Sequence, residues 1–280
     1  MKGRGNHMAE PFHLMEDSYF LIKNWQKINP KIFVGFTTKN GGISGGPYFN
    51  NNMGLHVGDD NTKVVFNRKQ FAEKIDFPLS QWVCCEQTHG SNVQYITEAD
   101  LGKGSESYGD SLKDCDGIYT DQKNTLLALC FADCVPIYFF APSYGLCGIV
   151  HAGWKGTVKN ICRSLIEEWK KHGIPVEKIL VTIGPSICNQ CYIVDNKIID
   201  QVEKLPLTDV QRFYTKVEKT QYKINLKALN QALLENEGIL PKNIQVSGFC
   251  SSCDQTYFYS HRRDKGQTGR MIGFIGIREA

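Results

Sequence analysis

Three side chains that can bind a metal, those of His89, Cys134 and His151, follow or end apolar runs that are typical of strands. Because glycine, aspartate or proline stands beside each of them, each is expected where a strand gives way to a turn. Turns at one rim of a sheet can meet, so the three side chains are predicted to converge. Two histidines and one thiolate with an open fourth position form the ligand set of a catalytic zinc ion, not of a closed structural one.

The same residues permit two other interpretations. In a metal-free cysteine hydrolase or amidase, Cys134 would be the nucleophile and His151 the base, since a neighbouring base activates a thiol. The protein could instead be a non-enzymatic partner-binding protein in which the site is vestigial. The residue types and their spacing leave these alternatives open.

Two further cysteine pairs, Cys188 with Cys191 and Cys250 with Cys253, also have metal-ligand spacing. One structural zinc ion held by all four thiolates is one interpretation. The long interval between the pairs and the lack of zinc-knuckle glycines favour packed, reduced cysteines instead. Since no export signal precedes the eleven cysteines, they are interpreted as reduced thiols of a cytoplasmic protein.

Cationic side chains are concentrated in residues 260–270, which are predicted to form a turn between two strands. A solvated hairpin tip is one interpretation of this charge. Arginines held in a fixed loop are also the usual means of binding phosphate through paired hydrogen bonds.

Bulk composition narrows the class of protein. The chain has 280 residues, 41% of them hydrophobic and 22% charged, as in ordinary globular proteins. No run approaches the roughly 20 apolar residues of a membrane span. The net charge of +3 is too small and too scattered to indicate nucleic-acid binding, although it suits an anionic substrate. Residues 1–7 resemble a vector-derived leader, which leaves 8–280 as a single catalytic domain.

Short apolar runs and amphipathic segments alternate irregularly along the chain. Helices are predicted from residue 61 or 62, at 157–172, around 196–204 and at 225–237. Strands are predicted at 31–37, 82–85, 93–96, 117–120, 126–131, 137–140, 146–150, 178–183, 244–246, 257–260 and 271–277. Strands outnumber helices without regular βαβ alternation, and no GxGxxG or Walker A pattern is present. This favours a mixed α/β (α+β) layered sandwich over a doubly wound sheet.

Five motifs, in this order, resemble the bacterial laccase-domain family. Its members were long called multicopper polyphenol oxidoreductases and were later described as purine nucleoside phosphorylases. The likeness extends from about residue 32 to residue 277. The motifs are Gln87-Thr88-His89-Gly90, Ala132-Asp133-Cys134-Val135-Pro136-Ile137, His151-Ala152-Gly153-Trp154-Lys155-Gly156-Thr157, Ile183-Gly184-Pro185-Ser186-Ile187 and Ser260-His261-Arg262-Arg263-Asp264.

The resemblance implies a single-domain α/β/β/α sandwich similar to the catalytic domain of cytotoxic necrotizing factor deamidases. It implies zinc bound by His89, Cys134 and His151, with purine nucleosides and phosphate as substrates. The implied activities are phosphorolysis of adenosine, inosine and methylthioadenosine, and hydrolytic deamination of adenosine. Copper is less expected, because a blue-copper laccase needs a dense His-x-His supply and this chain has seven histidines and no such pair.

Further residues are expected to act around this centre. Asn52 and His56 are expected to line the nucleoside pocket, and Gln87 and Asp133 to orient the metal ligands from behind. The residues expected to hold phosphate are Arg68, Arg262 and Arg263. The sequence does not indicate the preferred nucleoside or the oligomeric state.

Overall fold

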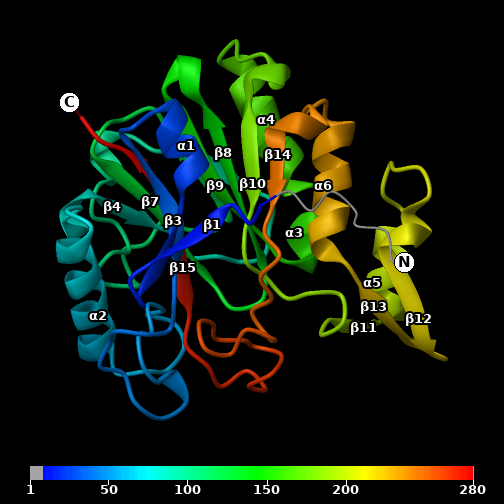
Figure 1. Ribbon diagram of the computed structural model, residues 1–280, viewed down its shortest axis with the longest axis horizontal. Helices are drawn as coiled ribbons and strands as arrows, with labels where there is room; N and C mark the ends of the chain where they lie inside the picture. The colour runs from blue at the N-terminus through cyan, green and yellow to red at the C-terminus, as the bar shows by residue number, and fades with distance from the viewer. Residues whose placement is uncertain (1–8, 280) are drawn as a thin grey trace.

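Two six-stranded sheets, packed face to face, form the centre of the protein (Figure 1). The computed structural model describes residues 9–279, so the predicted leader at residues 1–7 lies outside the described residues. Helices cover the outer face of each sheet, which gives four layers and confirms the predicted mixed α/β sandwich. Within the described residues no helix has the length and apolar character to cross a membrane.

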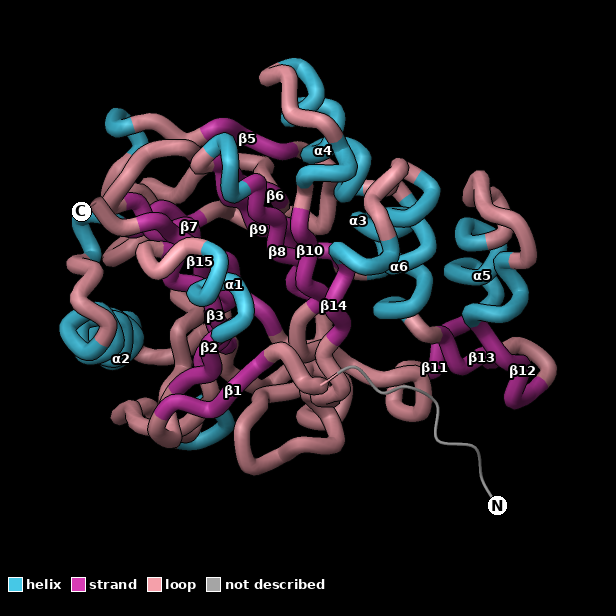
Figure 2. The backbone as a smooth tube through the Cα atoms, turned by 45° about the horizontal axis from the view of Figure 1, so that its top comes forward, coloured by secondary structure: helices cyan, strands magenta, loops and turns pink. Residues whose placement is uncertain are grey.

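The two large sheets are mainly antiparallel. Sheet I has the strand order β1 (Phe12–Met15), β2 (Tyr19–Ile22), β3 (Ile32–Thr37), β15 (Met271–Ile277), β7 (Thr125–Phe131) and β4 (Trp82–Cys84). Sheet II has the order β14 (Ile244–Val246), β10 (Leu180–Ile183), β8 (Val135–Ala141), β9 (Leu146–Ala152), β6 (Gly117–Thr120) and β5 (Val93–Tyr95). A small sheet III, with the order β11 (Ile193–Asp195), β13 (Gln221–Ile224) and β12 (Tyr214–Glu218), lies beside α5 (Asn196–Val202) at one end of the molecule (Figure 2).

Aromatic side chains fill the space between sheets I and II. Phe36 and Phe131 are almost completely buried there and pack against each other. Tyr138 of sheet II is fully buried, and its hydroxyl donates to the Gly35 carbonyl of sheet I at 2.8 Å. The two sheets are therefore joined by a hydrogen bond as well as by apolar contact, since a buried hydroxyl without a partner would be costly.

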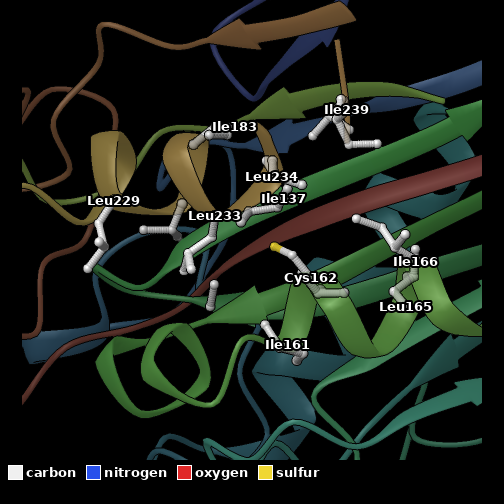
Figure 3. Packing of buried hydrophobic residues seen from close by; sticks show 14 of the residues in the cluster. Ile137, Ile161, Cys162, Leu165, Ile166, Ile183, Leu229, Leu233, Leu234 and Ile239 are labelled. Carbon is white, nitrogen blue, oxygen red and sulfur yellow. The ribbon is translucent and has the colours of Figure 1, made fainter. Parts of the chain in front are cut away.

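Helices cover each large sheet on its outer side. Helix α2 (Asn61–Lys74) covers sheet I, and α1 (Lys23–Ile28) precedes β3. The helices that cover sheet II are α3 (Trp154–Val158), α4 (Ile161–Lys171) and α6 (Leu226–Asn236). Figure 3 shows Ile161, Leu165 and Leu233 among the side chains packed at this interface.

The single helix predicted at residues 157–172 is wrong, because the structure has two helices there. Asn160 adopts a left-handed conformation with φ of 53°, which interrupts the helical path between α3 and α4. Its side chain then accepts a hydrogen bond from the Arg163 amide and begins α4. The break turns α4 so that its apolar face packs on sheet II.

The strand predicted at residues 257–260 is also wrong. These residues form a turn and an irregular segment between β14 and β15. Phe258 is buried against Phe20 and Phe36, and the Tyr259 hydroxyl donates to the Tyr48 carbonyl. Apolar burial produced the strand-like pattern, and the cationic residues 260–270 consequently do not form a hairpin tip.

Arg68, predicted to bind phosphate, instead holds two loops together. It is buried in α2, and its guanidinium donates to the Met53 carbonyl at 2.7 and 2.9 Å. The same group donates to the carbonyls of Gly104 and Ser105 at 2.7 Å each. The predicted phosphate role does not fit the structure, because these donors have partners inside the protein.

Replacing Arg68 by leucine should lower the free energy of unfolding by about 3 kcal/mol or more, since each buried carbonyl left without a donor costs roughly 1–3 kcal/mol. Urea denaturation measures this loss. Lys69→Leu is the matched control, because it removes only an exposed ion pair with Glu106. That pair should contribute less than about 1 kcal/mol. Equal, small losses in both variants would contradict the role given to Arg68.

Candidate active site

His89, Cys134 and His151 meet where the chain passes from sheet I to sheet II. His89 lies on the connection from β4 to β5, and Cys134 lies on the connection from β7 to β8. His151 is the penultimate residue of β9. It is paired with Pro136 of β8, and Pro136 follows Cys134 by two residues. The candidate ligand atoms of all three residues lie within 4.8 Å of one another, as the sequence predicted.

Gly153 permits this close approach. A Cβ atom at this position would lie 3.0 Å from Cys134 Sγ and 3.0 Å from His89 Cδ2. Both contacts are tighter than those normally tolerated, so a side chain here would displace two of the three candidate ligands. The glycine that follows β9 is thus part of the site although it has no functional group.

Asp116 orients both histidines, and the sequence analysis missed it. Its carboxylate is fully buried and lies 2.8 Å from His151 Nδ1. It also accepts hydrogen bonds from the backbone amides of Thr88, His89 and Gly90, at 3.1, 3.0 and 2.6 Å. With Nδ1 facing Asp116, His151 has Nε2 left for a ligand, which is the usual arrangement behind a metal-bound histidine.

The charges of Cys134 and His151 depend on each other. Burial alone would raise the pKa of the Cys134 thiol, but the charge of His151 and hydrogen bonds from both histidines lower it overall. Burial alone would lower the pKa of His151, but the Cys134 charge and the hydrogen bond to Asp116 raise it overall. Without a metal the pair therefore favours a thiolate beside an imidazolium. A thiolate is also the form in which cysteine binds a metal.

One candidate ligand, and one residue next to another, have unusual backbone conformations. His89 has φ of 60° and Asp133 has φ of 86°, both in the region that non-glycine residues seldom occupy. The Asp133 carboxylate accepts hydrogen bonds from Ser251 Oγ at 2.6 Å and from the Arg262 amide at 2.7 Å. It therefore ties the segment after β14 to Cys134, and backbone strain of this kind is concentrated at functional sites.

Gln87 does not hydrogen-bond to a candidate ligand, although it was predicted to orient one. Its side-chain amide pairs with the backbone of Cys130, donating to the carbonyl at 2.9 Å and accepting from the amide at 2.7 Å. It fixes the end of β7, three residues before Asp133. Gln87 therefore influences the position of Cys134 only indirectly, by fixing the backbone at Cys130.

The three candidate ligands line a cavity of about 380 Å³, which is within the range of small-molecule sites. Its other lining residues are His56, Gln87, Cys130, Ala132, Asp133, Trp154, Ile187, Tyr192, Leu226, His261, Arg262 and Arg270. The set combines aromatic faces with positive charge. His56 lies in the wall as predicted, while Trp154, Tyr192 and Arg270 were not foreseen as site residues.

The arginines of residues 260–270 differ in where they point. Arg262 lines the cavity, stacks on the Tyr192 ring at 4.9 Å and donates to the Ile193 carbonyl. Arg270 also lines the cavity; its Nη1 donates to the Thr268 and Gly269 carbonyls at 2.9 and 3.0 Å, while its Nη2 has no hydrogen-bond partner among the described residues. Arg263 does not, because its guanidinium donates to the Asp264 carboxylate and to backbone carbonyls, which uses the donors predicted to hold phosphate.

Asn52 was predicted to line the pocket, but it is buried behind it. Its side-chain oxygen accepts from the Arg270 amide at 2.8 Å and from the Gly54 amide at 2.9 Å. Its nitrogen donates to the Asp59 carboxylate at 3.0 Å. Asn52 therefore positions Arg270. The only signal of this in the sequence is that Arg270 belongs to the cationic segment already expected to bind phosphate.

Comparison with known proteins supplies the family. The profile described as multi-copper polyphenol oxidoreductase laccase matches residues 33–278. The chain belongs to this family. A Bacillus subtilis relative named purine nucleoside phosphorylase YlmD is 45% identical, over 96% of this chain and 98% of the relative. A relative of the same name from Geobacillus stearothermophilus is 47% identical, over 88% and 90% of the two chains.

Solved structures of the family have the same fold. The crystal structure of the Bacillus licheniformis hypothetical protein YfiH superposes with a TM-score of 0.93 at 43% identity, covering 96% of this chain and 99% of that one. YlmD from Geobacillus stearothermophilus superposes with a TM-score of 0.91 at 42% identity, covering 97% and 100%. The resemblance inferred from the motifs is thereby confirmed.

Asp116→Asn should weaken metal binding at the His89–Cys134–His151 group by about 10- to 100-fold, because loss of a carboxylate behind a ligand typically has this effect. Competition between the protein and a chelator for Zn²⁺ measures the change. Asp114→Asn is the matched control, since this exposed carboxylate contacts Thr88 and Asn92 but neither histidine. Unchanged affinity in Asp116→Asn would contradict the role of Asp116.

Proposed function

We propose that the protein is a zinc-dependent purine nucleoside phosphorylase that also deaminates adenosine and cleaves methylthioadenosine. The observation that carries the proposal is the convergence of His89, Cys134 and His151 at a cavity lined by arginines and aromatic rings. The names of the two YlmD relatives support nucleosides and phosphate as substrates.

The donor set fits a zinc ion. Two imidazoles and a thiolate suit this metal and leave one position open toward the cavity. When bound, zinc would supply a Lewis acid that polarises a substrate atom or a water molecule. Copper oxidation, which the family description names, has less support. Among the described residues the candidate metal groups are this triad and four cysteines, without the histidine-rich set of a multicopper centre.

In phosphorolysis, a phosphate oxygen forms a bond to ribose C1′ while the bond from C1′ to the purine N9 breaks. The bonding electron pair leaves with the purine, which takes up a proton. Arg262 and Arg270 would hold the phosphate, since both line the cavity and a guanidinium binds oxyanions through charge-assisted hydrogen bonds. The Trp154 and Tyr192 rings offer flat apolar surface for the purine.

In deamination, water adds at C6 of the adenine ring and the amino group leaves as ammonia with the proton that water gives up. This reaction needs the purine at the His89–Cys134–His151 end of the cavity but needs no phosphate. The two activities therefore make different demands on the arginines. Product analysis of adenosine with and without phosphate, on protein of known metal content, tests the proposal directly.

One observation favours a second candidate, the metal-free cysteine hydrolase. Cys134, His151 and Asp116 form a chain of nucleophile, base and orienting carboxylate, the arrangement of a catalytic triad. His89 is not needed in such a triad, although its ring nitrogen lies within 4.8 Å of the Cys134 sulfur. Untagged protein should be tested for stoichiometric zinc. If chelation removes both the zinc and the turnover, and added zinc restores the turnover, the metal-free candidate is excluded.

Cys134→Ala should abolish nucleoside turnover and remove metal from the triad while the protein stays folded, because an open site contributes more to chemistry than to packing. Chromatography of the products and circular dichroism measure the two effects. Cys162→Ala is the control. It removes a buried thiol on α4, which lowers stability by about 1 kcal/mol but leaves the cavity intact. Normal turnover by Cys134→Ala would refute the proposed site.

Arg262→Ala should reduce kcat/KM for phosphorolysis about tenfold to hundredfold, since a charge-assisted contact contributes roughly 1.5–3 kcal/mol. Deamination should change much less, so the products of adenosine should shift from adenine toward inosine. Lys265→Gln is the control, because it removes a charge from the same segment without lining the cavity. An equal loss of both activities would mean that Arg262 only shapes the wall.

A further inference from the structure

The cysteines of two CxxC pairs come together in a cluster, although the pairs lie far apart in the chain. Cys188 and Cys191 lie on the segment from β10 to β11, and Cys250 and Cys253 lie on the segment from β14 to β15 (Figure 1). Their four Sγ atoms lie within 4.8 Å of one another. The sequence favoured packed, reduced thiols, in part because the interval between the pairs is long. In the folded protein the two pairs nevertheless lie side by side.

The spacing of the sulfur atoms matches a mononuclear tetrahedral site. With zinc–sulfur bonds near 2.3 Å, the ligands of such a site are about 3.8 Å apart. Cys253 Sγ lies 4.0 Å from Cys188 Sγ and 3.4 Å from Cys191 Sγ. These distances are far longer than the roughly 2.05 Å of a disulfide bond, and one disulfide would involve only two of the four sulfurs.

The surroundings of the cluster suit negatively charged sulfur. The backbone amides of Cys188 and Cys253 both point at Cys250 Sγ, at 3.2 and 3.4 Å. Amide donors of this kind stabilise a metal-bound thiolate. The Cys188 bond joins the first pair to the second, and the Cys253 bond closes the turn of the second pair onto its own Cys250.

A buried lysine supplies positive charge beside the same cluster. Lys227 of α6 is only 8% exposed, and its ammonium donates to the carbonyls of Ser247 and Phe249 at 2.8 Å each. Burial lowers the pKa of this ammonium, while the charges of Cys250, Glu10, Cys188 and Asp254 oppose that shift. A buried cation needs nearby negative charge. A zinc ion bound by four thiolates has a net charge of minus two, so the cluster would provide negative charge beside Lys227.

We propose that Cys188, Cys191, Cys250 and Cys253 bind a second zinc ion, in a closed site separate from the His89–Cys134–His151 group. Four thiols release their protons to solvent as four zinc–sulfur bonds form, and no open position remains for substrate. The site therefore has a structural role. This inference does not depend on which reaction the cavity catalyses.

The second site would fix the wall of the cavity. Ile187 and Tyr192, on either side of the first pair, both line the cavity. Within the second pair, Ser251 donates to the Asp133 carboxylate, which also holds the Arg262 amide. A metal joining the two pairs would thus hold the Tyr192 and Arg262 segments together. Its loss should raise KM for nucleoside more than it lowers kcat.

Metal analysis of untagged protein, purified with reductant and added zinc, tests the proposal. The full chain should contain two zinc ions, Cys134→Ala one, and Cys253→Ser one. Ser252→Ala is the matched control and should keep two, because its neighbours at 251 and 253 are unchanged. Cys253→His should also keep two, since histidine can replace a thiolate ligand. One zinc in the full chain and none in Cys134→Ala would overturn the proposal.

Cobalt provides a measurement that does not require the cluster variants to fold. Cys134→Ala protein loaded with Co²⁺ should show the intense thiolate-to-cobalt charge-transfer band and the visible bands of tetrahedral sulfur coordination. Both should survive in Ser252→Ala/Cys134→Ala. Absence of these bands from folded Cys134→Ala protein, or a mass showing disulfides among the four cysteines under reducing conditions, would overturn the proposal.

Discussion

The buried carboxylate of Asp116 is the constraint on which the site geometry depends. A charge removed from water is tolerated only when hydrogen bonds replace the lost solvation. Burial alone would raise the pKa of Asp116. The hydrogen bond from His151, the charge of His151 and the hydrogen bonds from the backbone amides of Gly90 and Thr88 lower it overall. The ionised group therefore joins the β4–β5 connection to the end of β9. Moving either histidine would leave part of this charge unsatisfied.

This constraint also explains why the candidate site lies where the chain crosses from one central sheet to the other. The β4–β5 and β7–β8 connections both cross from sheet I to sheet II, so their backbones lack regular ladder partners there. Loops of this kind need side-chain acceptors and donors to satisfy their amides and carbonyls. Asp116 accepts hydrogen bonds from the amides of the β4–β5 connection. Gln87 both donates and accepts at the backbone of Cys130, near the end of β7. The scaffold that closes the sandwich thus also positions the candidate ligands.

The candidate ligands could be predicted from the sequence because their signal is local. A histidine or cysteine beside glycine, aspartate or proline at the end of an apolar run marks a turn at a strand end, and most of the predicted strands are present. Asp116 could not be found in this way. It precedes a strand in a glycine-rich stretch, and its role follows from the pairing of β6 with β9. Strand pairing over such distances is not encoded in any short window.

The same limit explains the wrongly predicted elements and why the sequence did not favour a shared four-cysteine site. Burial of Phe258 and Tyr259 produced a strand-like pattern at a segment that packs without a partner strand. The left-handed Asn160 divided a continuous helical pattern, since the periodicity of apolar residues does not reveal a single residue with positive φ. The long interval from Cys188 to Cys250 counted against a shared zinc site, because β14 pairs with β10 only in the folded protein.

The arginines show most clearly how one residue type takes two roles. Irregular segments contain carbonyls without partners, and a guanidinium with its five donors can satisfy several at once. Arg68 and Arg263 serve in this way, so their charge is used to build the walls of the site. Arg262 and Arg270 each use Nη1 for backbone carbonyls as well, but they also line the cavity. Positive charge is therefore concentrated at the cavity by arginines that are themselves anchored to the surrounding loops.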